Sequence, residues 1–116
     1  MMEAPTNLEI RCAELGRKLS ERVKDEKVFN EALSILEEQG PYAMFLYLKA
    51  RHKEEAGPIS EKSLDFLSSI FGLSKKGDVL EAIKELATDL DRLLFARDLL
   101  RTALSYARYH LKAGKD

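Results

Sequence analysis

The sequence predicts an all-α protein: a single domain over residues 1–116, formed by a bundle of about six helices with a long C-terminal helix. Three observations predict it. Apolar residues recur at helical spacing, and no stretch alternates with the two-residue period of a strand. Glycine, proline and capping residues separate the periodic segments. A chain of 116 residues is long enough for one hydrophobic core but not for two.

The first two helices are predicted on either side of a charged break at residues 24–27. Asn7 can cap the first helix, because its side-chain oxygen can accept from a free backbone N–H. The apolar stripe of this helix is Leu8, Cys12, Leu15, Leu19 and Val23. The stripe of the second helix is Val28, Ala32, Leu33, Ile35 and Leu36. Gly40 ends the second helix, and Pro41 starts the third at its first position, where the missing N–H costs nothing.

The third helix begins with a continuous apolar run at residues 42–48, which predicts a position in the middle of the bundle. Residues 49–55 continue it as a polar tail toward the surface. Residues 56–58, Ala-Gly-Pro, predict a loop, and Ser60 is the expected cap of a fourth helix. The apolar residues of that helix are Leu64, Phe66, Leu67, Ile70 and Phe71.

A second loop is predicted at residues 72–77, before two further helices. Asp78 with Glu81 resembles a capping box and starts a fifth helix. Thr88 with Asp91 repeats this signal for the last helix, which extends to residue 112.

The last helix has two faces. Its apolar residues form one broad sector: Leu93, Ala96, Leu99, Leu100, Ala103, Leu104, Ala107 and Leu111. Four cations fall in a narrow sector at its edge and are named the C-terminal row: Arg97, Arg101, Arg108 and Lys112. No carboxylate shares that narrow sector, so the row suggests a surface for a polyanion. A solvated face, or ion pairing to nearby Asp98, is the competing interpretation.

The first helix carries a similar set of cations beside its apolar stripe. They are named the N-terminal row: Arg11, Lys18 and Arg22. If the two helices pack as neighbours, the cations of both rows can converge on one groove, unless carboxylates such as Glu14 pair with them. Tyr106 is expected to pack, whereas Tyr109 lies nearer solvent, where an aromatic ring beside cations can stack on a base.

Composition and motifs argue against catalysis. The net charge of −1 predicts no partner by itself, although 34% of the residues are charged. Neither His52 nor His110 has a second His or Cys at helical spacing, and Cys12 is expected in the core. We therefore expect no catalytic residue, no metal site and no cofactor. No segment approaches the roughly 20 apolar residues of a membrane span.

The same composition indicates where such a protein works. A single cysteine excludes an internal disulfide and favours a reducing cytoplasm. Glu, Lys and Arg are abundant while amides are rare, which is typical of a thermophile. The amide residues are Asn7, Asn30 and Gln39.

Two segments resemble a known family. Residues 32–51, "ALSILEEQGPYAMFLYLKAR", resemble the central signature of the small helical subunit of type III-B CRISPR effector (Cmr) complexes. Residues 89–113, "DLDRLLFARDLLRTALSYARYHLKA", resemble the family's final helix. Tyr106 stands at its usual tryptophan position and Arg108 at a basic position after it. The small subunit of type III-A complexes, similar in size and role, is the confusable relative.

The resemblance implies a non-catalytic part of a ribonucleoprotein. Such subunits stack along the complex beside other subunits and copies of themselves, and hold guide or target RNA through basic residues. Both rows of cations are then the expected phosphate contacts. A helical protein–protein adaptor without a nucleic-acid role is the alternative, with residues 57–58 and 72–77 as contact loops. A helix-turn-helix regulator fits less well, because the connection at residues 72–77 exceeds that motif's usual turn.

Overall fold

The computed structural model describes residues 4–73 and 77–114, with side chains from Asn7 onward, as six α-helices without a strand. The helices are α1 (Ala4–Arg22), α2 (Glu26–Gln39), α3 (Pro41–Arg51), α4 (Lys53–Phe71), α5 (Val79–Leu86) and α6 (Leu90–Gly114). The predicted all-α bundle with a long C-terminal helix is confirmed, since α6 has 25 residues.

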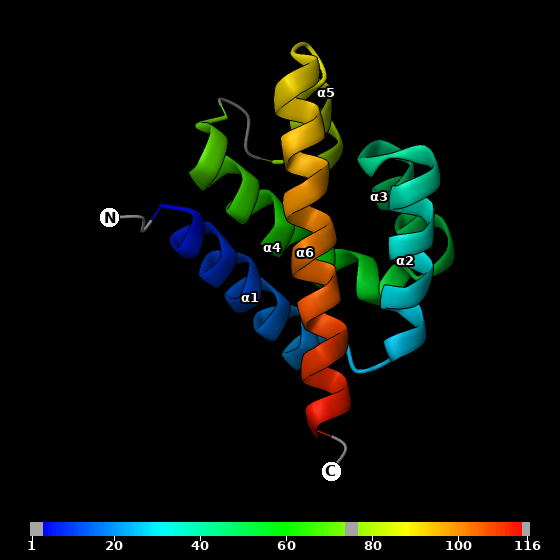
Figure 1. Ribbon diagram of the computed structural model, residues 1–116. Coiled ribbons are helices and arrows are strands. Elements are labelled where there is room, and N and C mark those ends of the chain that lie inside the picture. The colour runs from blue at the N-terminus through cyan, green and yellow to red at the C-terminus, as the bar shows by residue number, and fades with distance from the viewer. Residues whose placement is uncertain (1–3, 74–76, 115–116) are drawn as a thin grey trace.

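Helix α6 runs through the middle of the bundle, with α1 packed along one side of it and α2 along the other (Figure 1). Helix α4 passes behind α6 and returns along α1 in the opposite direction. Helix α3 lies beside α2, and the short α5 contacts α3, α4 and α6. The two flanks of α6 therefore meet different helices.

The core contains most of the predicted apolar stripes. Its largest fully buried side chains include Phe29, Phe45 and Leu100. Cys12 is 1% exposed, which confirms its prediction as a core residue. Burial raises the pKa of this thiol to about 11. Its sulfur lies 3.6 Å from the Leu99 carbonyl oxygen, so α1 and α6 meet at this level.

Helices α1 and α6 approach each other closely at Gly16. A Cβ atom at this position would lie 2.6 Å from the Ala103 carbonyl oxygen and 2.6 Å from the Tyr106 Cβ. Such an overlap in a packed core forces side chains or backbone to move. The facing side chains of Ala103 and Ala107 are small and fully buried. This crossing fixes which flank of α6 faces α1.

Aspartate caps explain where three helices begin. Asp78 accepts from the Leu80 backbone N–H at 3.0 Å, which confirms the predicted start of α5. Asp25 caps α2 in the same way. The start of α6 was predicted one residue too early: Asp89, not Thr88, accepts from the first backbone N–H groups. The predicted cap Asn7 lies inside α1, because α1 begins at Ala4.

The break between α3 and α4 lies at His52, so the predicted loop at residues 56–58 is wrong. Helix α4 continues through Pro58, which falls in its second turn, where the missing N–H removes one backbone hydrogen bond. Ile59 is fully buried and holds this part of α4 on the core. The predicted cap Ser60 therefore lies inside α4.

The apolar run of α3 is not buried on all sides, contrary to the prediction. Met44, Phe45 and Leu48 enter the core, but Tyr42 is 38% exposed and Leu46 is 48% exposed. The reason is position: α3 packs on α2, α4 and α5, which cover one side of it and leave the other open. One side of α3 therefore exposes apolar side chains to solvent.

Candidate nucleic-acid interface

The two rows of cations lie on helices that pack as neighbours, yet they face different parts of the bundle. In the C-terminal row, Arg101, Arg108 and Lys112 contact α2. In the N-terminal row, Arg11 contacts α4 and Lys18 lines a pocket with it. Helix α2 lies on one flank of α6, whereas the C-terminal part of α4 lies beside α1 on the other flank, so the structure does not bring the two rows together in one groove (Figure 1).

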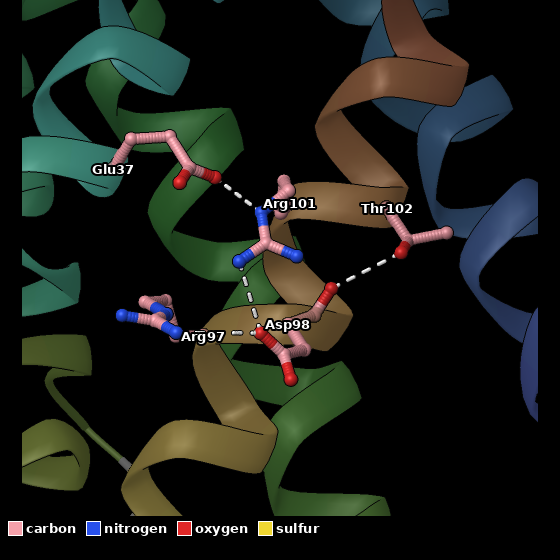
Figure 2. Close-up of polar contacts among 5 residues, drawn as sticks. All are labelled: Glu37, Arg97, Asp98, Arg101 and Thr102. Carbon is pink, nitrogen blue, oxygen red and sulfur yellow. Dashed lines mark hydrogen bonds and ion pairs between the residues drawn. The ribbon is translucent and has the colours of Figure 1, made fainter.

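Arg101 is the most heavily paired member of the C-terminal row (Figure 2). Its Nε donates to a carboxylate oxygen of Glu37 on α2. Its Nη2 donates to Asp98 Oδ1 at 3.0 Å on its own helix. The hydrogen bond to Glu37 raises the pKa of the Arg101 guanidinium above its ordinary value. Arg101, which is predicted to contact phosphate, is thus already paired with two carboxylates.

Arg97 shares the same carboxylate. Its Nη2 lies 3.7 Å from Asp98 Oδ1, and the Thr102 hydroxyl donates to the Asp98 backbone carbonyl (Figure 2). The Nε of Arg97 is buried without a hydrogen-bond partner, and 34% of the side chain is exposed. The competing sequence interpretation, ion pairing to Asp98, is therefore confirmed for both Arg97 and Arg101.

The other end of the C-terminal row is tied to the beginning of α2. Arg108 Nη1 donates to Asn30 Oδ1 at 3.0 Å, and Lys112 Nζ lies 3.0 Å from Glu26 Oε2. With the Arg101–Glu37 pair, these contacts form a polar seam between α2 and α6. A phosphate that binds here has to displace an existing contact or share it.

The acceptors of this seam were missed in the sequence, although their spacing gives a signal. On α2 they are Glu26, Asn30 and Glu37, which share one face. Their intervals match, in reverse order, those between the cations they meet: Lys112, Arg108 and Arg101. Such mirrored spacing is what two antiparallel helices need to pair along their length.

The N-terminal row is exposed and nearly unpaired. The Arg11 guanidinium donates to the Ser69 hydroxyl on α4, which leaves its charge uncompensated. Lys18 and Arg22 are exposed, and neither forms a hydrogen bond or ion pair with any residue that the structure describes. This row is the part of the predicted interface that is free to meet a polyanion.

An open pocket of about 210 Å³ lies between α1 and α4. Arg11, Lys18 and Lys62 contribute the cations of its lining, and Glu14 and Asp65 contribute carboxylates. Lys62 was not predicted as a site residue. Nothing local in the sequence marks it, because its role depends on α4 packing against α1.

The two tyrosines of α6 lie on the side of α1. The Tyr106 hydroxyl donates to Glu9 Oε2 at 2.9 Å, and this hydrogen bond raises the pKa of Tyr106. The Tyr109 ring meets the Tyr106 ring edge-on, with centroids 6.1 Å apart. Tyr109 is 60% exposed, which confirms its predicted position near solvent.

A further polar cluster joins α2, α3 and the corner at His52. Glu31 Oε1 accepts from the Tyr47 hydroxyl at 2.8 Å and is hydrogen bonded to His52 Nε2 at 2.7 Å. Both hydrogen bonds lower the pKa of Glu31, and the one with His52 has the larger effect. The sequence does not mark this cluster, because the hydrogen-bond partner of His52 comes from another helix.

Within residues 4–73 and 77–114, no group of three or more His, Cys, Asp or Glu side chains is arranged to hold a metal ion. In the same part of the chain, none of the helices is apolar over a length that would cross a bilayer. Comparison with protein-family models, with curated proteins and with solved structures finds no match to this chain.

Proposed function

We propose that the protein is a non-catalytic small subunit of a type III CRISPR interference complex, which stacks along the complex and holds guide or target RNA by its backbone phosphates. The N-terminal row carries the proposal, because it places cations on one exposed face of α1 without carboxylate partners. Phosphate contacts position a strand but carry no sequence information, which suits RNA of any sequence. The family is proposed because residues 32–51 and 89–113 resemble the small subunit of type III-B complexes.

The two rows have different roles in this proposal. The N-terminal row makes the first contacts with phosphate, since its charges are available. The C-terminal row holds α6 to α2, and its cations reach RNA only where a phosphate replaces an acceptor such as Glu37. The residues of the C-terminal row are therefore proposed as secondary RNA contacts: Arg97, Arg101, Arg108 and Lys112.

Exposed apolar side chains support binding to other subunits or to copies of the chain. Tyr42 and Leu46 lie one turn apart on α3, and Leu90 and Leu94 lie one turn apart on α6. Single exposed apolar residues are ordinary, whereas contiguous exposed apolar patches mark interaction surfaces.

The same surfaces favour the alternative function, a helical adaptor without RNA. Its predicted contact loops lend no support, since residues 57–58 lie inside α4. Of the second predicted loop, residues 74–76 lie outside the described residues.

Reconstitution with type III backbone subunits and guide RNA tests the proposal. We expect the wild-type chain to join the assembly and to increase its capture of single-stranded target RNA. The variant R11E/K18E/R22E should join but lose that increase. A matched control, K49E/K53E/K84E, makes the same change in net charge with exposed lysines of α3, α4 and α5, and should keep the increase.

Three outcomes distinguish the ideas. A chain that does not join type III subunits contradicts the family assignment. A chain that joins them without affecting RNA capture favours the adaptor. Equal loss in the N-terminal variant and in the lysine control contradicts the assignment of the N-terminal row.

A further inference from the structure

We propose that the pocket between α1 and α4 binds the sugar–phosphate backbone of a strand and distinguishes RNA from DNA by the ribose 2′-hydroxyl. This inference rests on the proposed function, and it names the chemistry by which the N-terminal row holds its ligand. It also adds Lys62, Glu14 and Asp65 to the candidate site.

The order of charges in the pocket is the first argument. Arg11 on α1 contacts Ser69 on α4, and the two helices run in opposite directions. Lys18 comes seven residues after Arg11, and Lys62 comes seven residues before Ser69. Both lysines line the pocket, about 10 Å along the helices from the Arg11–Ser69 contact. The pocket is therefore cationic at both ends.

Carboxylates occupy the middle of the same pocket. Glu14 lies between Arg11 and Lys18 on α1, and Asp65 lies between Lys62 and Ser69 on α4. No ion pair joins Glu14 or Asp65 to any residue that the structure describes. The pocket thus presents cation, carboxylate and cation in order, with all of these charges left for a ligand.

This order matches a nucleic-acid strand, in which phosphate, sugar and phosphate alternate. A carboxylate repels phosphate, so a pocket for phosphate alone has no use for two of them at its centre. An ionised carboxylate accepts hydrogen bonds, and an acidic side chain that accepts from a ribose hydroxyl is a known recognition device. The 2′-hydroxyl is the group by which proteins tell RNA from DNA.

The size of the pocket agrees with this ligand. Its volume of about 210 Å³ is below the roughly 300–1,000 Å³ of a pocket for a free small molecule. It is also open to solvent, as a passing strand requires. We therefore expect it to hold one sugar with its flanking phosphates and to leave the base outside.

Titration of the full chain with oligonucleotides of about eight nucleotides, followed by NMR, tests the inference. Three strands of one sequence are compared at equal salt: RNA, DNA and 2′-O-methyl RNA. We expect RNA to bind about threefold or more tightly than the other two, because only RNA has the hydroxyl donor. The largest shifts should come from the backbone amides around Arg11, Lys18 and Lys62.

A variant without the two carboxylates distinguishes recognition of the 2′-hydroxyl from a general change in the charge of the pocket. In E14M/D65A the affinity for DNA should rise, because repulsion is removed, while the ratio of RNA to DNA affinity should fall to about one. The control E38M/E61M removes exposed carboxylates of α2 and α4 outside this pocket, and should keep the ratio. The variant K62M should weaken both RNA and DNA.

The outcomes separate this inference from the proposed function. RNA and DNA that bind the pocket equally, or an unchanged ratio in E14M/D65A, overturn the inference and leave phosphate binding standing. Shifts confined to another surface overturn it as well. If no strand perturbs any amide at millimolar concentration, the inference fails together with the RNA role in the proposed function.

Discussion

The N-terminal row and the C-terminal row have the same pattern in the sequence, but the fold gives them different environments. Each sets cations beside an apolar stripe on a helix. Helix α2 pairs with the C-terminal row through Glu26, Asn30 and Glu37. Helix α4 meets the N-terminal row with Ser69, Lys62 and Asp65, and Asp65 forms no ion pair with any residue that the structure describes. The helix packed against a row, rather than the row itself, decides whether its charges are available.

The largest loss of stability is expected from a substitution where α1 and α6 cross, because this contact sets which neighbouring helix each row faces. Gly16→Ala should destabilise the fold by about 1–3 kcal/mol, because its new Cβ overlaps the Ala103 carbonyl oxygen. Chemical denaturation measures the change. Gly57→Ala is the control: it adds a methyl group to α4 in open space and should leave stability unchanged or raise it by up to about 1 kcal/mol. Equal effects of the two variants would disprove the close crossing.

Replacing one cation from each row should have a smaller effect on stability, and the loss should differ between the two rows. Arg101→Met removes a cation that joins α6 to α2 and should cost about 0.5–1 kcal/mol, the upper range for partly exposed ion pairs. Lys18→Met removes an unpaired cation and should stay within about 0.5 kcal/mol of the wild type. The unfolding midpoints of both variants in urea check this. A larger loss of stability in Lys18→Met than in Arg101→Met would contradict the description of the N-terminal row as unpaired and the C-terminal row as paired.

The smallest effect concerns pH and the anchoring of α2 on its other side. The pKa of Glu31 is lowered in the folded protein by its hydrogen bonds to His52 and Tyr47. Its contribution to stability is therefore complete above the ordinary value of 4.5 and is lost as pH falls through the folded pKa. Glu31→Gln should flatten the dependence of stability on pH below 4.5, as measured by denaturation at several pH values. An unchanged acid slope would contradict this.

The helices and most of their boundaries were predictable because their signals are local. Gly40-Pro41 and Asp78 mark boundaries by backbone conformation and capping, which do not depend on the rest of the chain. The corner at His52 was not predictable in this way. Its acceptor Glu31 belongs to another helix, and burial of Ile59 carries α4 through Pro58.

The candidate site was predictable only in part for the same reason. Helical spacing places the cations of each row on one face, and the structure agrees. Which face meets which helix is a tertiary matter: Gly16 brings α1 and α6 together, yet the pairing of Arg101 with Glu37 and the approach of Lys62 follow from α2 and α4. The mirrored spacing of α2 and α6 is a sequence signal for the pairing of these two helices.

The salt dependence of RNA binding tests the difference between the two rows most directly. Affinity of the full chain for single-stranded RNA is measured at several salt concentrations, for R11Q/K18Q/R22Q and for R97Q/R101Q/R108Q. We expect the N-terminal variant to lose about 2 units of log–log slope, at about 0.7 per phosphate contact, and the C-terminal variant to keep most of the wild-type slope. A loss of slope confined to the C-terminal variant would show that the paired row, and not the free one, holds the RNA.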